Sequence, residues 1–295
     1  MKIPKTLTTI RSLAQNEDLN FLLTNRVPRI AVTVAVGRLS KIRSPLLCSL
    51  LIFVWRLFVD LDLDDAEQAS FDSLHACFTR KLKPDARPLD PRPGVLVSPS
   101  DGIVGEHGRI HNGTVFQAKG FPYTLGELLG SLPDALVFEG GSYVTLRLTS
   151  AMYHRFHAPH DLSIQQVNYI NGDTWNVNPI ALKRVERLFC KNERAVIHAR
   201  LGKGNFPIAL VPVAAILVAS IRLHFVNVLL HLSYPGPNQI RCNANVSKGE
   251  ELGWFEHGST IIVLAPEGFE LSETVQAGAQ VRMGQSLMHL PQETH

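Results

Sequence analysis

Three short stretches of the chain place chemically reactive residue types beside tight turns. "SPSDG" contains Asp101, "YHRFH" holds His154 and His157 three positions apart, and "HGST" puts Ser259 directly after Gly258. A carboxylate, an imidazole and a hydroxyl are the parts of a triad in which a base activates a serine. The members of such triads lie far apart in sequence and meet only in the fold, so the order Asp101, His157, Ser259 is acceptable.

Each of these signals has a plainer interpretation. "SPSDG" is also typical of a turn in which the aspartate caps the backbone. The histidine pair would suit a metal ion, but no third ligand follows at an obvious spacing, so we expect no metal site. Ser259 does not lie in the G-x-S-x-G turn of a conventional serine hydrolase. A serine directly after a glycine either belongs to a turn before a strand, or the Gly258–Ser259 peptide bond is itself the reactive group.

Composition indicates a folded protein in a reducing compartment. The 295 residues are 45% hydrophobic and 19% charged, enough for one large domain or two small ones. The four cysteines lie far apart and form no C-x-x-C pair, which argues against a zinc site and against a disulfide framework.

Positive charge is concentrated at the beginning of the chain. The first 60 residues carry nine lysines and arginines against three acidic residues, and no acidic residue lies between Leu19 and Val59. The rest of the chain carries 20 basic and 23 acidic residues. A basic, apolar leading segment on a nearly neutral body favours an anionic membrane surface as partner and disfavours nucleic acid.

The leading segment does not have the layout of a signal peptide. Within 44–61, about ten apolar residues precede Arg56 and Asp60, whereas a membrane-spanning helix needs about 20. We therefore expect a helix that lies in the plane of the interface, with a buried core helix as the alternative. Residues 1–70 are predicted to form a basic, amphipathic, membrane-associating helical segment.

The remainder, 71–295, is predicted to be a β-rich catalytic domain. A short helix is expected at 71–82, and four prolines in 83–94 predict an extended connector. From Val95 onward, short β-branched runs alternate with Gly, Asn, Asp and Pro, which is typical of an antiparallel sheet system. Two further helices are expected, around 124–131 and 179–188. The predicted fold class is α+β, a mainly antiparallel β core with N-terminal amphipathic helices before it.

The most apolar stretch, 206–232, is long enough to suggest a transmembrane helix. Pro207, Pro212, Arg222 and His224 interrupt it, and its valine and isoleucine content favours strands. We expect one or two buried strands here.

The closing segment "VQAGAQVRMGQSL" resembles the glycine-turned hairpins of biotinyl- and lipoyl-carrier domains, and "VSPSDGIVGEHGRI" has a similar character. A carrier domain attaches its cofactor to a lysine at a hairpin tip, but no lysine follows Lys248. We therefore expect carrier-like hairpins without carrier chemistry.

Taken together, the motifs resemble those of the bacterial phosphatidylserine decarboxylases. The similar segments run from about residue 71 to the C-terminus: "FTRKLKPDARPLD", "SPSDGIV", "FQAKGFPYTLGELL", "YHRFHAP", "LFCKNERAVI", "GSTIIVLAP" and "MGQSL". The first 60 residues share only a basic, amphipathic character with the family. Two positions depart from the common pattern: His257 replaces a frequent leucine, with no role that we can assign, and "TSAMYHR" replaces "SPRDYHR".

The resemblance implies a self-processing enzyme. In this family the proenzyme cuts itself between Gly and Ser, here Gly258 and Ser259, and the serine becomes a pyruvoyl cofactor. The products would be a β chain of 1–258 and an α chain of 259–295. His157 would be the base, oriented by Asp101, and His154 would serve proton transfer during decarboxylation of phosphatidylserine to phosphatidylethanolamine.

The resemblance also implies partners and a location. These are phosphatidylserine, anionic membrane lipid and the two chains of the protein itself, with a homodimer left open and no nucleic acid. The protein would be peripheral, on the cytoplasmic face of the cell membrane. Two other functions fit the residues: a membrane-associated lipid serine hydrolase that does not cut itself, and a carrier-like binding domain.

Overall fold

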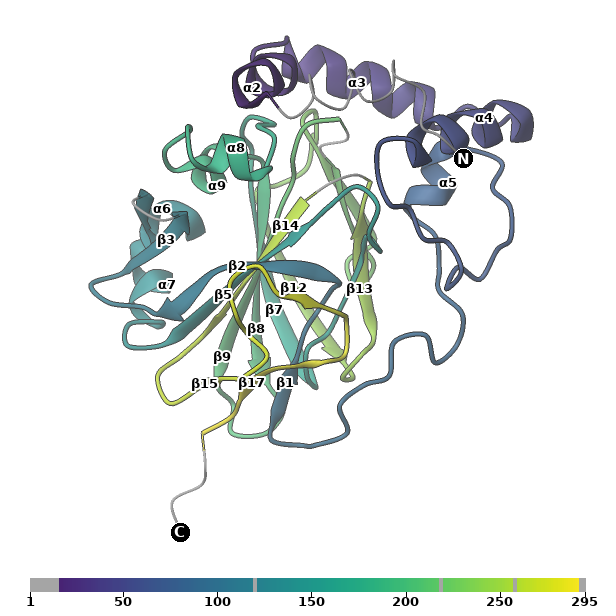
Figure 1. Ribbon diagram of the computed structural model, residues 1–295. Coiled ribbons are helices and arrows are strands. Elements are labelled where there is room, and N and C mark those ends of the chain that lie inside the picture. The colour runs from purple at the N-terminus through teal and green to yellow at the C-terminus, as the bar shows by residue number, and fades with distance from the viewer. Residues whose placement is uncertain (1–15, 119–120, 218–219, 257–258, 292–295) are drawn as a thin grey trace.

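The computed structural model describes residues 16–118, 121–217, 220–256 and 259–291. Helices from the beginning of the chain lie together along one side of a β-rich body (Figure 1). The predictions made for Gly258 and His257 fall outside the described residues. The predicted class, α+β with mostly antiparallel sheets and N-terminal helices, is confirmed.

Three helices form the N-terminal layer: α2 (Glu17–Asn25), α3 (Arg29–Ser40) and α4 (Pro45–Arg56). The Asn16 side chain accepts from two backbone N–H groups at the start of α2, and the Ser44 hydroxyl caps α4. These caps satisfy groups that the first turn of a helix leaves unpaired. The helix predicted within 44–61 is present as α4. No helix in the described ranges is long and apolar enough to cross a bilayer.

The body is built on an eight-stranded antiparallel sheet in the order β12-β7-β8-β9-β14-β5-β2-β16. Its strands are β2 (Gly102–Arg109), β5 (Ser142–Leu148), β7 (Leu162–Ile170), β8 (Arg194–Leu201), β9 (Pro207–Val213), β12 (Gln239–Val246), β14 (Ser259–Ala265) and β16 (Gln280–Val281). β14 lies between β5 and β9 and every one of its residues is buried. A strand covered on both faces is apolar without alternation, which explains the run "TIIVLA".

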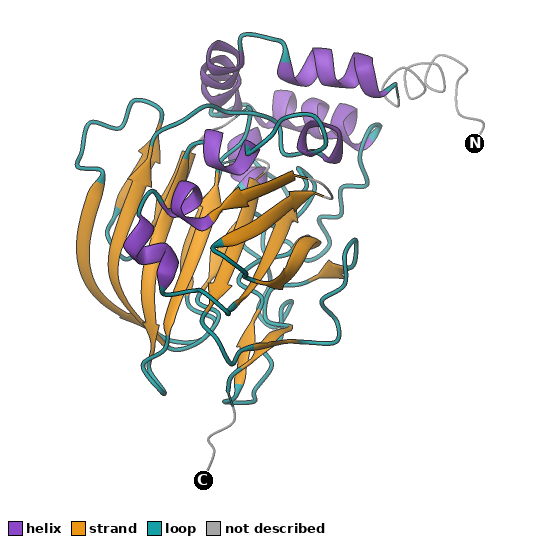
Figure 2. Ribbon diagram, turned by 90° about the vertical axis from the view of Figure 1, so that its left-hand side faces the viewer, coloured by secondary structure: helices purple, strands orange, loops and turns teal. Residues whose placement is uncertain are grey.

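A second, four-stranded sheet, in the order β11-β10-β13-β6, packs against one face of the large sheet. It contains β6 (Arg155–His157), β10 (Ser220–Leu223), β11 (Val228–His231) and β13 (Glu251–Phe255). The core between the two sheets includes Phe156 and Phe255, whose ring centres are 5.3 Å apart. Figure 2 shows the strong curvature of the large sheet, with the N-terminal helices along one end of it and short helices in front of its face.

Short helices cover the other face of the large sheet, where Tyr143, Phe189 and Ile262 belong to a second core. The short helices of the chain are α5 (Leu74–Phe78), α6 (Leu125–Leu129), α7 (Leu132–Leu136), α8 (Pro179–Leu182) and α9 (Leu188–Lys191). The helices expected at 71–82, 124–131 and 179–188 are therefore present but shorter, and the last is divided into α8 and α9.

The apolar run 206–232 forms strands, as expected, but three of them (β9, β10 and β11) instead of one or two. The two carrier-like segments meet in space. β1 (Val95–Val97) pairs with β17 (Ser286–His289), β17 also pairs with β15 (Glu270–Leu271), and β2 pairs with β16. A separate hairpin is formed by β3 (Thr114–Ala118) and β4 (Phe121–Thr124).

Candidate active site

β5 and β14 are paired in the large sheet, and the residues that follow β5 are paired with the residues that precede β14 in the small sheet. In the large sheet Ser259 pairs with Leu148, the last residue of β5. In the small sheet the Phe255 N–H donates to the His154 carbonyl oxygen at 2.9 Å, next to the pairing of β13 with β6. The pairing on both sides confines Ser259 and His154 to the same crossing between the two sheets, although 105 positions separate them in sequence.

Ser259 begins β14 and is fully buried. Its hydroxyl oxygen has no hydrogen-bond partner in the part of the chain that the structure describes. Buried polar atoms in folded proteins are nearly always paired, so an unpaired hydroxyl calls for a functional explanation. Gly258, on the other side of the predicted scissile bond, lies outside the described residues.

His154 is also fully buried, and neither ring nitrogen has a hydrogen-bond partner within the described ranges. Its ring lies edge-on to Phe78, with 6.0 Å between ring centres. Burial lowers the pKa of His154 to about 3, and the nearby charge of Arg80 contributes to the shift. The imidazole is therefore neutral at pH 7.

His157 makes two hydrogen bonds that fix its ring. Nδ1 lies 2.9 Å from the Gly249 carbonyl oxygen, and Nε2 lies 2.9 Å from the Tyr153 hydroxyl. A carbonyl oxygen only accepts, so Nδ1 carries the proton. Burial lowers the pKa of His157, which keeps the ring neutral with its lone pair on Nε2. That lone pair accepts from the Tyr153 hydroxyl.

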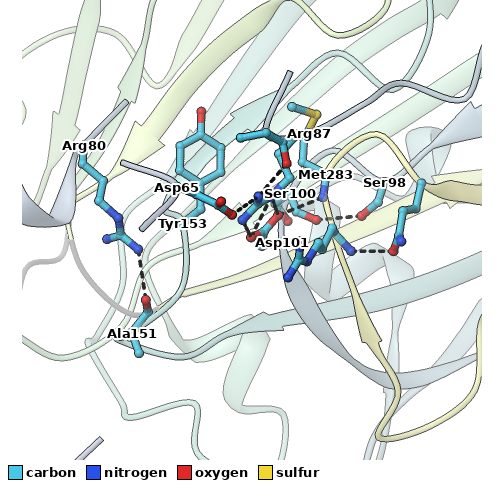
Figure 3. Close-up of polar contacts among 12 residues, drawn as sticks. Asp65, Arg80, Arg87, Ser98, Ser100, Asp101, Ala151, Tyr153 and Met283 are labelled. Atoms are coloured by element: carbon cyan, nitrogen blue, oxygen red, sulfur yellow. Dashed lines mark hydrogen bonds and ion pairs between the residues drawn. The ribbon is translucent and has the colours of Figure 1, made fainter. Parts of the chain in front are cut away.

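Asp101 is nearly buried and is held by Arg87 (Figure 3). Arg87 Nε and Nη2 donate to its two carboxylate oxygens at 2.9 and 2.7 Å, and the Met283 N–H donates at 2.9 Å. Arg87 also donates to Asp65 at 2.8 Å. In the described residues Asp101 makes no hydrogen bond to His157. The Gly249 carbonyl occupies the position in which a triad aspartate would orient the ring, and the triad stays a prediction.

The loop between β5 and β6 is tied down by Arg80. Its guanidinium donates to the Ala151 carbonyl at 3.0 Å and to the Cys77 carbonyl at 3.1 Å (Figure 3). This loop leads directly into the histidine pair, so Arg80 fixes the backbone on which His154 stands.

A polar cavity of about 340 Å³ opens beside this loop. Asp60, Asp62, Asp65 and Asp101 line it together with Arg80. A neighbouring cavity of about 310 Å³ reaches His157. Arg87 and Arg282 also line the first cavity, so four aspartates face three arginines there.

Sequence reasoning missed three residues of the site, namely Arg80, Arg87 and Tyr153. Tyr153 stands inside the quoted histidine motif, so its position next to His154 was the available signal. Arg87 lies in the proline-rich connector, where no local pattern indicates that the chain returns to Asp101.

Comparison with known proteins fits this geometry. The family model for phosphatidylserine decarboxylase matches residues 74–289. The chain belongs to the phosphatidylserine decarboxylase family. The expected enzyme class, a decarboxylase, is thereby confirmed.

Similar proteins named phosphatidylserine decarboxylase proenzyme cover most of the chain. One from Azotobacter vinelandii is 35% identical over 286 residues, which are 92% of this chain and 98% of the relative. One from Shewanella baltica is 34% identical over 297 residues, covering 95% and 99%. One from Pseudomonas fluorescens is 39% identical over 241 residues, covering 77% and 82%. The Azotobacter and Shewanella matches therefore extend into the leading segment, further than the motifs alone indicated.

Proposed function

We propose that this chain cleaves itself between Gly258 and Ser259, and that the processed protein converts phosphatidylserine to phosphatidylethanolamine with a pyruvoyl group made from Ser259. The observation that carries the proposal is the position of Ser259, fully buried at the start of β14 and directly after Gly258, in a chain of the phosphatidylserine decarboxylase family. Its hydroxyl has no partner among the described residues, a state that it shares with Thr145 and Thr260. The relatives' name, proenzyme, supports processing into chains.

Self-cleavage would begin with attack of the Ser259 Oγ on the carbonyl carbon of Gly258. The C–N bond breaks as the C–O ester bond forms, and the hydroxyl proton passes through a base to the freed amine. Loss of the Ser259 α-proton then breaks the ester Cβ–O bond, and residues 1–258 leave with a new carboxylate. Water hydrolyses the remaining dehydroalanine to a pyruvoyl group and ammonia.

The state of His157 supports its role as the base. Its ring is neutral, its Nδ1 proton is held by the Gly249 carbonyl, and its lone pair lies on Nε2. Nε2 is the atom that would take the Ser259 proton, and in the uncut chain it accepts a hydrogen bond from Tyr153. The orienting role of Asp101 is part of the proposal, and its contact with Arg87 places its charge beside the cavity that borders Tyr153.

The residues at the crossing fit a pyruvoyl group at position 259. Ser259 and His154 are both fully buried, and their polar side-chain atoms have no partners within the described ranges. When present, a pyruvoyl carbonyl accepts the electrons released as carbon dioxide leaves an amino acid headgroup. His154 would return a proton to the substrate carbon. It can hold that proton only when a nearby anion offsets the unfavourable burial of its charge.

The position of β14 supports lasting association of the two products. The α chain, 259–295, would begin with β14, which is hydrogen-bonded to β5 on one side and β9 on the other. Cleavage before Ser259 would leave this strand in the centre of the sheet. The β and α chains would therefore remain one folded body.

Exposed apolar side chains on the N-terminal helices support a peripheral membrane location, proposed here for the cytoplasmic face. The large ones on α2, α3, α4 and the turns beside them are Leu22, Leu23, Ile30, Val34, Leu39, Ile42, Leu46, Leu47, Leu50, Leu51, Phe53, Val54 and Phe58. Such a patch on a basic segment fits helices that lie within the headgroup layer of an anionic bilayer. The helices lie along one side of the body, so this side would face the lipid (Figure 1).

Incubation with phosphatidylserine vesicles tests the proposal against its alternatives. The wild-type protein should release carbon dioxide and form phosphatidylethanolamine, and Ser259→Ala should do neither. Release of fatty acid or serine without carbon dioxide would indicate the lipid hydrolase. Vesicle binding without turnover would indicate the binding domain.

A further inference from the structure

A groove lies between α3 and the β10–β11 hairpin, close to the segment that precedes Ser259. It has a volume of about 290 Å³ and is mainly apolar. Val34, Gly37 and Arg38 line it from α3, and Leu229 and Leu232 line it from the hairpin side. The buried Glu256, three positions before Ser259, also borders it. The groove thus lies between the N-terminal helix α3 and a residue close in sequence to Ser259.

Gly37 keeps this groove open. It lies inside α3, where a glycine costs about 1 kcal/mol relative to alanine. A β-carbon at this position would meet no atom within 4 Å, so packing does not require the glycine. A larger side chain here would project into the space between α3 and the hairpin. Because packing does not explain the glycine, we interpret the space beside it as room for a ligand.

The groove carries one unneutralised positive charge. Lys41, also on its wall, forms an ion pair with Glu256 at 3.1 Å. The Arg38 side chain makes no hydrogen bond or ion pair with any residue that the structure describes. α3 has no acidic residue. A guanidinium beside an apolar groove suits an anion attached to a hydrocarbon chain, since it binds phosphate through a fork of donors.

The polar cavity lined by Asp60 and Asp62 differs from the groove. Charges of both signs line it, and Arg87 is already paired with Asp65 and Asp101, so it offers no apolar path for an acyl chain and no single sign of charge. The groove, in contrast, is continuous with the exposed apolar side of α3, because Val34 both lines it and is 41% exposed. A lipid could enter it while its acyl chains stay in an apolar environment.

We infer that the groove between α3 and β10–β11 binds the phosphodiester and the upper acyl chains of the phospholipid substrate, with Arg38 on the phosphate. This inference rests on the proposed function. It makes Arg38 and Gly37 determinants of phospholipid binding, separate from the residues proposed for self-cleavage.

The test compares two groove variants with matched controls on phosphatidylserine vesicles. Arg38→Glu is paired with Arg26→Glu, which makes the same charge change at an exposed position before α3. Gly37→Leu is paired with Ala35→Leu, which adds a side chain to an exposed position of α3 outside the groove. All four variants should cleave as the wild type does. Each groove variant should have a kcat/KM about tenfold below its control, as expected for loss of one charged contact or of the lipid path.

Glycerophosphoserine, which has no acyl chains, separates binding of the phosphate by Arg38 from binding of the acyl chains beside Gly37. Arg38→Glu should lower its turnover, and Gly37→Leu should leave it unchanged. Inorganic phosphate, which has no acyl chains, should compete only weakly with vesicles, and inhibition by phosphate that Arg38→Glu leaves unchanged would overturn the role of Arg38. Groove variants equal to their controls, with an active wild type, would overturn the groove alone. A wild-type protein that releases no carbon dioxide would overturn the proposed function as well.

Discussion

The Lys41 Nζ lies 3.1 Å from Oε2 of Glu256, and this ion pair joins the end of α3 to the segment just before Ser259. The Glu256 side chain is only 7% exposed, and His75 Nδ1 lies 3.8 Å from its other oxygen. Thr33 of α3 also accepts a hydrogen bond from the Leu217 N–H at 3.0 Å. The leading segment, predicted as a membrane anchor, therefore also contacts the chain around the proposed cleavage site.

We expect the Lys41–Glu256 pair to position the carbonyl side of the scissile bond. Lys41→Glu or Glu256→Lys alone should slow self-cleavage about tenfold, because each leaves like charges beside a nearly buried group. The double variant, which restores an ion pair with reversed polarity, should recover most of the rate. The measurement is the fraction of cut chain against time on a denaturing gel.

The Arg43–Asp72 pair supplies the control for this swap. It lies on the neighbouring turn at 3.5 Å, but its side chains are 85% and 49% exposed. Exposed pairs contribute little, so either reversal there should leave the cleavage rate within about twofold. If charge reversal at both pairs slowed cleavage equally, the cause would be the overall charge of the leading segment. The Lys41–Glu256 pair would then have no specific role in positioning the scissile bond.

The two histidines should separate into two functions. His157→Ala should leave the chain uncut, because it removes the neutral ring whose Nε2 is available as a base. His154→Ala should cut itself but lose decarboxylation by at least about a hundredfold, the usual contribution of a positioned acid or base. Gel analysis and carbon dioxide release measure the two steps. A His154→Ala chain that stays uncut beside a cut His157→Ala chain would reverse the assignment.

Asp101→Asn tests the predicted triad against the contacts seen in the structure. The amide oxygen can still accept from Arg87 Nε and the Met283 N–H, but the amide NH2 would face the Arg87 Nη2 donor, so urea unfolding must show that the variant is folded. If the charge of Asp101 stabilises protonated His157 during cleavage, the rate should fall by about a hundredfold or more. A folded Asp101→Asn chain that cuts at the wild-type rate would leave Asp101 only a structural role with Arg87.

The buried state of His154 should appear in the pH dependence of stability. Its pKa is about 3 in the folded chain against an ordinary value of 6.5, so between these pH values the unfolded chain binds more protons. Stability must then rise with pH across this range, by about 1.4 kcal/mol per pH unit for one proton. His154→Phe in the uncut Ser259→Ala chain should reduce that slope by one proton in urea unfolding at pH 4.5 to 6. An unchanged slope would show that His154 does not titrate in this way.

The strand content could be predicted because β-branched runs between turn residues dominate the body. β12 has few β-branched residues, but its sequence, "QIRCNANV", alternates between polar and apolar residues as a strand at the edge of a sheet does. The helix α3 lies in the leading segment for which helices are predicted, although its sequence, "RIAVTVAVGRLS", is rich in valine and threonine, which favour strands. Tertiary contacts, among them the hydrogen bond of Thr33, override that preference.

The sequence names candidate site residues but does not predict their contacts. The motifs named Asp101, His154, His157 and Ser259, and the pairing of β5 with β14 explains why distant motifs meet. The contacts of Asp101 with Arg87 and of His157 with Gly249 depend on where loops return to the sheet. No local pattern in the sequence contains that information.

The intact mass of the purified wild-type protein tests the central claim most directly. Self-cleavage predicts two chains, residues 1–258 and a C-terminal fragment that begins at position 259. The fragment should lack a free amino terminus, carry a ketone that reacts with a hydrazine, and be absent in Ser259→Ala. A single uncut chain of 32.7 kDa from a preparation that decarboxylates phosphatidylserine would contradict the account.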